Sequence, residues 1–278
     1  MRYVIVVVMV LAACGRKSPG VAAGAPVPDS ALRAPNGDLV PNGDMGRSIL
    51  RGHAILAATR DSLPQHVGSS LRCTSCHLGD GRRENALPLT GVYARFPQYR
   101  SRAATVQRLE DRINDCFLRS LNGTALAFDD PAMRDIVAYL AFISRGVPIT
   151  DHAPQVGVGP ATGDTIAGSR VFVAQCARCH GADGGGTAAP LYPPLWGAKS
   201  FNIGAGMARV RTASAFVKHN MPFDMPGTLT DIDALNVAAY VMSRPRPDFA
   251  GKEKDWPRGG APDDAPYATT AGASKPPR

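Results

Sequence analysis

Aromatic side chains are scarce in this sequence, at 6% of its 278 residues. Grooves that bind single-stranded nucleic acid stack the bases on aromatic residues placed among basic ones, and no segment of this chain interleaves the two types. The formal net charge of +8 therefore does not indicate a nucleic-acid partner. A small anion or a membrane surface remains as its explanation.

The N-terminus lacks a hydrophobic run long enough to cross a membrane. Its uncharged stretch, Tyr3–Ala13, follows Arg2 and has the length of a signal-peptide core. The next residue is Cys14, and Leu11-Ala12-Ala13-Cys14 resembles the cleavage box of bacterial lipoproteins, in which the cysteine is lipidated. We therefore expect a signal peptide over residues 1–13 and a periplasmic protein that touches the membrane only through a lipid at Cys14. Ordinary cleavage, with Cys14 incidental, is the alternative.

Cysteine is also rare, with six residues, and four of them form two copies of Cys-x-x-Cys-His at 73–77 and 176–180. This spacing is the attachment signature of c-type haem, in which the cysteines form thioethers and the histidine ligates the iron. A zinc site would group four ligands, and each motif here stands alone. We expect two covalently bound haem c groups, haem 1 and haem 2, attached in turn to Cys73 and Cys76 with His77, and to Cys176 and Cys179 with His180.

Proline and glycine clusters divide the chain into two similar halves. They predict linkers at 14–45 and 146–164 and a proline-rich tail at 245–278, with folded domains at 46–145 and 165–244. Apolar periodicity predicts helices at 46–60, 131–144, 168–175 and 231–243. Each half resembles the class I cytochrome c fold, so we expect an all-α protein with two such domains in tandem. Domains this small need little secondary structure because the haem fills the interior.

The repeat suggests the second ligand of each iron. Met221 follows His180 by 41 residues and Cys116 follows His77 by 39, and a Gly-Thr pair comes soon after each. Met221 is therefore preferred over Met225 for haem 2, although Lys218 and His219 lie close enough to compete. For haem 1 the segment containing Cys116 has a helical period that also places Val106, Leu109, Ile113 and Ser120 on one face. A buried inert cysteine is the alternative to ligation.

Arginine is concentrated around Cys116. Between Arg72 and Arg119 the chain has nine arginines, no lysine and five acidic residues. Arginine binds oxyanions through its planar fork of donors. Arg112 lies one helical turn before Cys116 and Ser120 one turn after it. Thiolate ligation lowers the potential of haem 1 and thioether ligation raises that of haem 2, so electrons should pass from haem 1 to haem 2.

The segments 112–123 (RINDCFLRSLNG), 73–78, 99–102 and 244–257 resemble the dihaem thiosulfate dehydrogenases, and the resemblance extends from Gly46 to Tyr267. It implies oxidation of two thiosulfates to tetrathionate, or the reverse, at the Cys-ligated haem, with electrons passing to an external acceptor such as another cytochrome. It also implies that Cys116 is ligand and reactive sulfur and that Arg102, Arg112 and Ser120 bind the anion. A non-catalytic dihaem carrier, the dihaem subunit of the sulfur-oxidising multienzyme complex, and an enzyme for a related thiol or sulfur oxyanion stay open.

Overall fold

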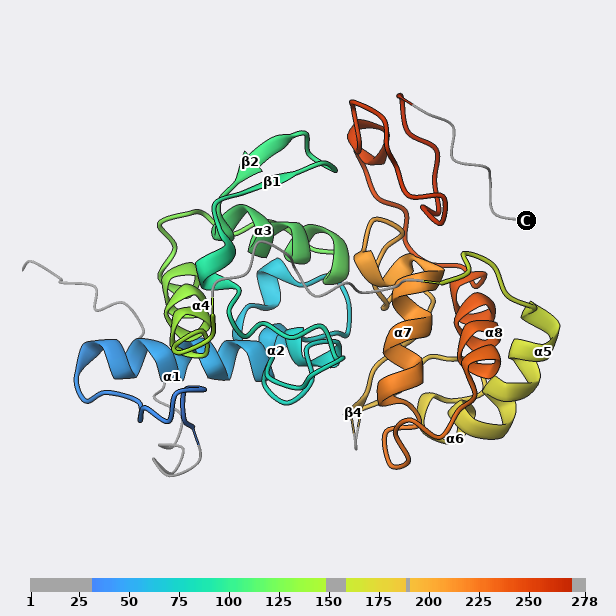
Figure 1. Ribbon diagram of the computed structural model, residues 1–278, viewed down its shortest axis with the longest axis horizontal. Coiled ribbons are helices and arrows are strands. Elements are labelled where there is room, and N and C mark those ends of the chain that lie inside the picture. The colour runs from blue at the N-terminus through green and yellow to red at the C-terminus, as the bar shows by residue number, and fades with distance from the viewer. Residues whose placement is uncertain (1–31, 149–158, 189–190, 272–278) are drawn as a thin grey trace, which may run out of the picture.

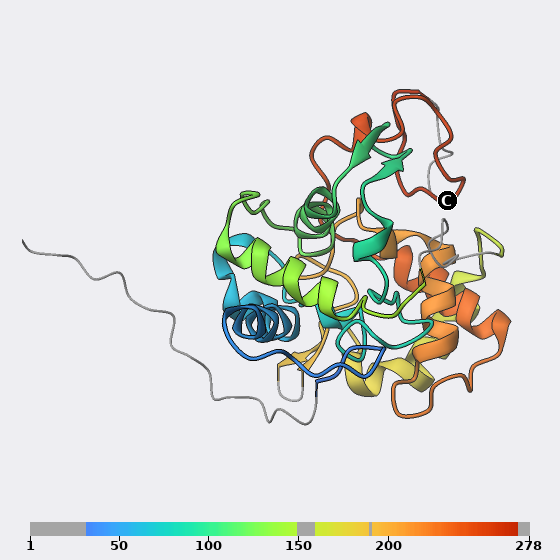
Figure 2. The same ribbon diagram turned by 60° about the vertical axis from the view of Figure 1, so that its left-hand side comes forward.

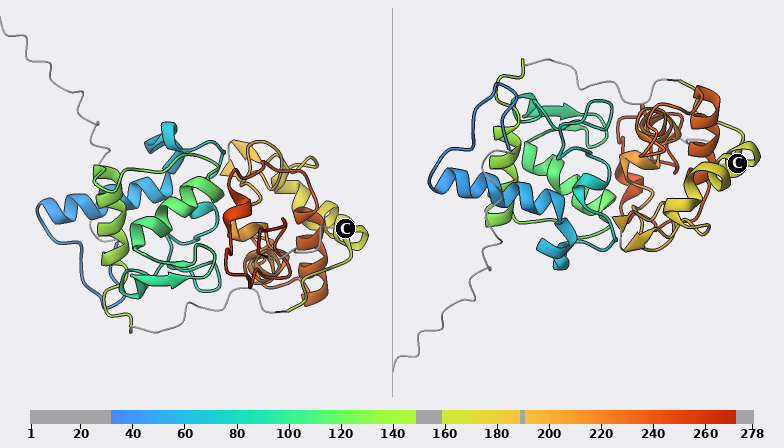
Figure 3. Two further views of the ribbon diagram at one scale, coloured as in Figure 1. Left: turned by 90° about the horizontal axis from the view of Figure 1, so that it is seen from above. Right: turned by 90° about the horizontal axis from the view of Figure 1, so that it is seen from below.

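The computed structural model describes residues 32–148, 159–188 and 191–271. The expected signal peptide, Cys14 and residues 149–158 of the expected linker lie outside the described residues. Helices dominate and form two bodies side by side, confirming the predicted all-α class (Figure 1). Views from above and below show the same separation (Figure 3). Within the described ranges, no helix is long and apolar enough to span a membrane.

The first body is built around two long helices and a short hairpin. Part of the expected linker also packs here, because Leu32, Ala34 and Val40 are buried in the core. The elements are α1 (Asp44–Ala57), α2 (Thr59–Ser62), η1 (Pro64–His66), η2 (Cys73–Ser75), η3 (Tyr93–Arg95), β1 (Gln98–Arg100), β2 (Thr105–Gln107), α3 (Leu109–Asp115), η4 (Cys116–Ser120) and α4 (Pro131–Phe142).

The second body repeats this plan with fewer residues. It begins with a short helix and ends with two long ones, before a tail with a single helical turn. The elements are α5 (Thr165–Val171), η5 (Phe172–Cys176), α6 (Ala177–His180), β3 (Thr187–Ala188), β4 (Leu191–Tyr192), η6 (Gly206–Ala208), α7 (Val210–Asn220), α8 (Asp231–Met242) and η7 (Lys252–Lys254).

A glycine at the crossing of the first and last helices occurs in both bodies. A Cβ on Gly52 of α1 would lie 2.0 Å from the Asp135 carbonyl oxygen of α4, and a Cβ on Gly168 of α5 would lie 2.0 Å from the Asn236 carbonyl oxygen of α8. Both distances are shorter than any real carbon contact, so only glycine lets these helices approach so closely. The shared crossing is a structural sign of the repeat.

Gly168→Ala is expected to destabilise the second body by about 1–3 kcal/mol, because the added methyl group must push α5 away from α8. A domain of this size would lose several degrees of melting temperature, measurable by circular dichroism. Gly206→Ala is the matched control, since Gly206 has open space at its Cβ position. An unchanged melting temperature for Gly168→Ala would show that the crossing is not tightly packed.

The helix that carries Cys116 is shorter than the sequence period predicted. The prediction placed Val106 on its apolar face, but Val106 lies in strand β2 and is 62% exposed. The helix α3 begins only at Leu109, where the Asp111 carboxylate accepts a hydrogen bond from the Arg108 backbone N–H at 2.8 Å. This acceptor satisfies a donor at the helix start, and pairing with β1 holds Val106 in the extended conformation.

The two bodies share a core rather than meeting at a simple surface. Phe201, Ala205 and Ala208 of the second body belong to the same buried cluster as the first body's core. Next to them, Asn202 Nδ2 donates to the Leu118 carbonyl oxygen at 2.8 Å, and the Asn202 backbone N–H donates to the Arg119 carbonyl oxygen at 3.2 Å. These contacts fix the second body against the turn that carries Cys116.

The proline-rich tail returns to the first body after α8. Seen from the side, it stands beside the β1–β2 hairpin (Figure 2). The Trp256 backbone N–H donates to the Arg102 carbonyl oxygen at 2.8 Å, and Trp256, Ala265 and Tyr267 form a small core of their own with Ile203 packed against it. The tail therefore forms a wall of the region around the hairpin.

Candidate functional site

Cys116 begins a π-helical turn that follows α3 directly. The Leu121 backbone N–H reaches back five residues to the Cys116 carbonyl oxygen at 2.9 Å. Such turns occur mostly within α-helices and often at functional sites. One turn earlier in α3, Arg112 Nη1 donates to the Cys116 sulfur at 3.1 Å. A guanidinium that donates to a thiol sulfur favours the anionic form of that thiol.

The electrostatic surroundings of Cys116 favour the thiolate. Burial on its own would raise the pKa of this thiol, but the positive charge of Arg112 and a hydrogen bond with His77 together lower that pKa to about 7. The same contact shows that the Cys116 and His77 side chains face each other. Because the two side chains lie close together, His77 and Cys116 fit residues that would hold the iron of haem 1 between them.

Each motif histidine is held by a backbone carbonyl. His77 Nδ1 lies 2.5 Å from the Leu87 carbonyl oxygen, and His180 Nδ1 lies 2.9 Å from the Pro193 carbonyl oxygen. A carbonyl oxygen only accepts, so Nδ1 donates its proton in each hydrogen bond and Nε2 is the nitrogen that remains to face a metal. This arrangement orients a histidine for metal ligation through Nε2.

A cavity of about 850 Å³ adjoins both haem-attachment motifs. Its volume lies in the range of pockets that hold cofactors, about 300–1,000 Å³. Mostly apolar side chains line it, as a haem requires, and the ligand candidate Met221 is one of them, whereas Met225 is 46% exposed and lies outside the lining. The lining includes Cys76, Cys176, Cys179, His180, Leu195, Phe201, Met207, Phe216, Val217, Met221, Val237, Val241 and Met242.

The two other candidate ligands of haem 2 are placed differently. Lys218 Nζ donates to the Leu229 carbonyl oxygen at 2.7 Å and forms an ion pair with Asp231 at 3.0 Å. His219 is exposed and lies outside the lining of the cavity. Met221 follows the last residue of α7 in extended backbone, whereas Cys116 lies inside a helix. The two positions that the repeat equates therefore differ in local structure.

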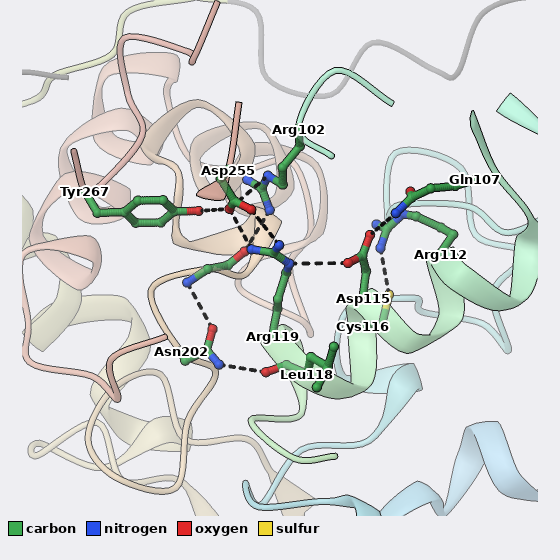
Figure 4. Close-up of polar contacts among 11 residues, drawn as sticks. Arg102, Gln107, Arg112, Asp115, Cys116, Leu118, Arg119, Asn202, Asp255 and Tyr267 are labelled. Carbon is green, nitrogen blue, oxygen red and sulfur yellow. Dashed lines mark hydrogen bonds and ion pairs between the residues drawn. The ribbon is translucent and has the colours of Figure 1, made fainter. Parts of the chain in front are cut away.

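A second cavity of about 370 Å³ is walled by arginines, and one of them, Arg112, contacts the Cys116 sulfur. Three of the predicted site residues line it together: Arg102 from the hairpin, Arg112 from α3 and Ser120 from the π-helical turn. Figure 4 shows how Arg112, Arg119 and Arg102 follow one another from Cys116 toward the tail. The lining is Gln98, Tyr99, Arg100, Ser101, Arg102, Ala103, Gln107, Arg112, Asp115, Arg119, Ser120, Gly206, Arg209, Trp256 and Pro262.

Two of these arginines carry no carboxylate partner. Among the described residues, no carboxylate lies within ion-pair distance of Arg100 or Arg112. Burial, followed by the charge of Arg112, lowers the pKa of Arg100, which shows that the two guanidinium groups lie near each other. Arg112 faces the Cys116 thiolate, whereas Arg100 is a partly buried cation without a carboxylate partner, and a bound anion would offset the cost of its burial. The sequence singled out Arg112 but not Arg100.

Arg102 lines the cavity, and its guanidinium already contacts other groups of the protein. Its Nη1 donates to the Gly204 carbonyl oxygen at 2.8 Å, its Nε lies 3.7 Å from Asp255, and it stacks on Trp256 at 4.4 Å. The sequence did not identify Arg119, Arg209 or Asp255 as site residues. No local sequence signal could have identified these residues, because they reach the cavity only when the tail returns to the first body and the second body packs against it.

Comparison with known proteins agrees with this geometry. Residues 65–149 match the family model described as "SoxA/TsdA, cytochrome c domain", and residues 166–245 match the model "Cytochrome c". The thiosulfate dehydrogenase of Allochromatium vinosum is 45% identical, over 80% of this chain and 87% of its own length. That of Psychrobacter arcticus is 38% identical, over 84% of this chain and 74% of its own.

A solved structure is similar over most of the chain. The thiosulfate dehydrogenase TsdBA from Marichromatium purpuratum superposes with a TM-score of 0.70 at 31% identity, over 76% of this chain. The chain spans only 49% of the length of that structure.

Proposed function

Because this chain belongs to the thiosulfate dehydrogenase family, we propose that it joins two thiosulfate ions into tetrathionate, or splits tetrathionate in reverse, beside Cys116. It is a dihaem cytochrome with two covalently bound c-type haems. The observation that carries the proposal is the Cys116 thiol, 3.1 Å from Arg112 Nη1, beside a cavity with five arginines in its lining. A plain electron carrier needs no such cavity.

The reaction balances with the two haems as electron acceptors. Two thiosulfate dianions form one sulfur–sulfur bond and release two electrons without gaining or losing a proton. The two c-type haems would supply two one-electron acceptors for these electrons. Cys73, Cys76, His77 and Cys116 would hold haem 1, and the corresponding residues of the second body would hold haem 2.

Cys116 supplies the sulfur on which the bond is built in this proposal. Its thiolate bonds to the terminal sulfur of the first thiosulfate as two electrons leave, giving a cysteine thiosulfonate with one negative charge. The terminal sulfur of a second thiosulfate then attacks that sulfur, tetrathionate departs, and the Cys116 thiolate is the leaving group. A thiol of lowered pKa is a good leaving group in such exchanges, which suits the pKa of about 7 that Arg112 and His77 give Cys116.

The arginines bring two dianions together. Arg112 and Arg100 have no carboxylate partner among the described residues, and they would bind the sulfonate oxygens through their paired N–H donors. Arg102 and Ser120 line the same cavity and complete the anion-binding set. In a site shielded from water, their charges offset a repulsion between two dianions that solvent would otherwise screen.

Electrons leave through the second body in the proposed scheme. Met221 as the second ligand of haem 2 would raise its potential above that of the thiolate-ligated haem 1. An external acceptor, another cytochrome, would then remove them. We place the protein in the periplasm, with a lipid at Cys14 as its membrane anchor, and the N-terminal sequence supports both proposals.

One assay tests the proposed function. Purified holoprotein is mixed with thiosulfate and an artificial electron acceptor, and then with tetrathionate and a reduced donor. We expect turnover in at least one direction, with tetrathionate or thiosulfate as the only sulfur product. Haem oxidation and reduction without either product would identify a plain electron carrier, and activity that needs an added protein partner would identify a subunit of a multienzyme complex.

Met221→Leu is expected to change haem 2 alone. Loss of the thioether lowers the potential of haem 2, so kcat should fall while KM for thiosulfate stays nearly constant. The near-infrared charge-transfer band of thioether ligation should disappear from the oxidised protein. Met225→Leu is the control, since Met225 is exposed. Loss of the band in Met225→Leu, and not in Met221→Leu, would reverse the assignment.

A further inference from the structure

Asp255 of the tail is the buried centre of the polar network beside the arginine cavity (Figure 4). Its side chain is 6% exposed. It accepts two hydrogen bonds from Arg119, at 2.7 and 2.8 Å, and one from the Tyr267 hydroxyl at 2.6 Å. Arg102 Nε lies 3.7 Å from the same carboxylate. One tail residue thus contacts two arginines of the cavity wall.

A second carboxylate of the tail forms an ion pair with a third arginine of the cavity wall. Asp264 has a fully buried side chain and accepts from Arg209 Nε at 2.7 Å. It also accepts from the backbone N–H of Arg211 at 3.1 Å, close to the start of α7. Arg209 comes from the second body and Arg119 from the first. The tail therefore forms hydrogen-bonded ion pairs with arginines of both bodies at one cavity.

The tail carboxylates set the charge of the cavity. Five arginines line it, and their carboxylate partners are Asp115, Asp255 and Asp264. Two positive charges are left over, on Arg100 and Arg112, and the Cys116 thiolate that accepts from Arg112 offsets part of this excess. The positive charge that remains would attract a sulfur oxyanion such as thiosulfate.

We infer that the tail is part of the active site, in which Asp255 and Asp264 are positioning residues that hold Arg102, Arg119 and Arg209 and limit the excess positive charge of the cavity. A larger excess would hold the anionic product as tightly as the substrate and slow its release. A bidentate carboxylate also fixes the plane of the Arg119 guanidinium. This inference rests on the proposed function.

Asp255→Asn is the test, because it removes the charge and nearly preserves the shape. Sulfate serves as an unreactive dianion probe. We expect sulfate to bind the oxidised holoprotein about tenfold more tightly by titration calorimetry, since one more guanidinium is left without a counter-charge. In the thiosulfate assay we expect kcat to fall about tenfold or more, through misplaced arginines and slower product release. A merely supporting residue would not tighten sulfate binding.

Matched variants separate charge from structure. Asp263→Asn changes a neighbouring tail aspartate that is 69% exposed and pairs with Arg211 at the surface, and it should match the wild type in both measurements. Tyr267→Phe removes a hydrogen bond to Asp255 but no charge at neutral pH, so sulfate affinity should stay within about twofold of the wild type. If Asp255→Asn does not fold, Asp264→Asn makes the same test at the other anchor.

The sulfate titration and the thiosulfate assay together support or overturn the inference. Unchanged or weaker sulfate binding in the aspartate variant overturns it, even if kcat and melting temperature fall. Tighter sulfate binding with lowered kcat supports it. If the wild-type protein binds sulfate but does not turn over thiosulfate or tetrathionate, the proposed function fails, and the calorimetric comparison still reports on the charge of the cavity.

Discussion

Replacement of Cys116 by glycine is expected to lower thiosulfate turnover by at least about a thousandfold while both haems stay attached, because it removes the sulfur on which the new bond forms. Turnover is measured with thiosulfate and an artificial acceptor. Haem content is measured by the absorbance of the denatured, reduced protein. The attachment cysteines of both motifs are untouched, so two haems per chain should remain.

Cys116→Ser is the matched control for size, since serine keeps the shape and loses the sulfur. It should be as inactive as Cys116→Gly, because a hydroxyl cannot form the sulfur–sulfur bond. Activity within about tenfold of the wild type in either variant would exclude the covalent role of Cys116. Loss of haem 1 in both variants would instead indicate a failure of maturation, which the haem content would reveal.

Arg112→Ala is expected to reduce kcat/KM for thiosulfate by about a hundredfold, because it removes a charged donor from a buried anion site. Arg100→Ala should have an effect in the same direction, and the double variant should lose less than the product of the two, since both guanidiniums line the same cavity and would bind the same anion. Arg112→Lys should recover only part of the activity, because lysine lacks the planar fork.

Arg108→Ala is the control for this series. Arg108 precedes α3, has a side chain that is 58% exposed and stacks on Phe128, and it lines neither cavity. Its removal should leave kcat/KM near the wild-type value. Equal losses in Arg108→Ala and Arg112→Ala would mean that the general positive charge of the surface matters, and not the cavity.

Local sequence patterns revealed the parts of the site that depend on local spacing. The haem motifs could be read from five residues each, and the helical period around Leu109 and Ile113 placed Cys116 on an inward face. That period failed at Val106, which the β1–β2 hairpin holds in a strand. The arginine count pointed to an anion, and the family resemblance selected Arg102, Arg112 and Ser120, which the structure brings to one cavity.

The rest of the site depends on tertiary contacts that no local pattern records. Arg209 reaches the cavity only because the second body docks through Asn202 onto the turn after Cys116. Asp255 and Asp264 lie in a tail whose prolines predicted no regular structure, and their role follows from the place where the tail returns. Whether Arg100 has a carboxylate partner depends on which acidic side chains the fold brings near it. The sequence has five acidic residues between Arg72 and Arg119, and it does not show which of them approach Arg100.

Electron paramagnetic resonance of the oxidised wild-type holoprotein tests the central claim most directly, namely that Cys116 faces the iron of haem 1 as a thiolate in an arginine-walled site. We predict two low-spin ferric signals, one with the signature of histidine and thiolate ligation. That signal should disappear in Cys116→Met and persist in Arg112→Ala. A wild-type spectrum with only histidine–methionine or histidine–histidine haems would contradict the account.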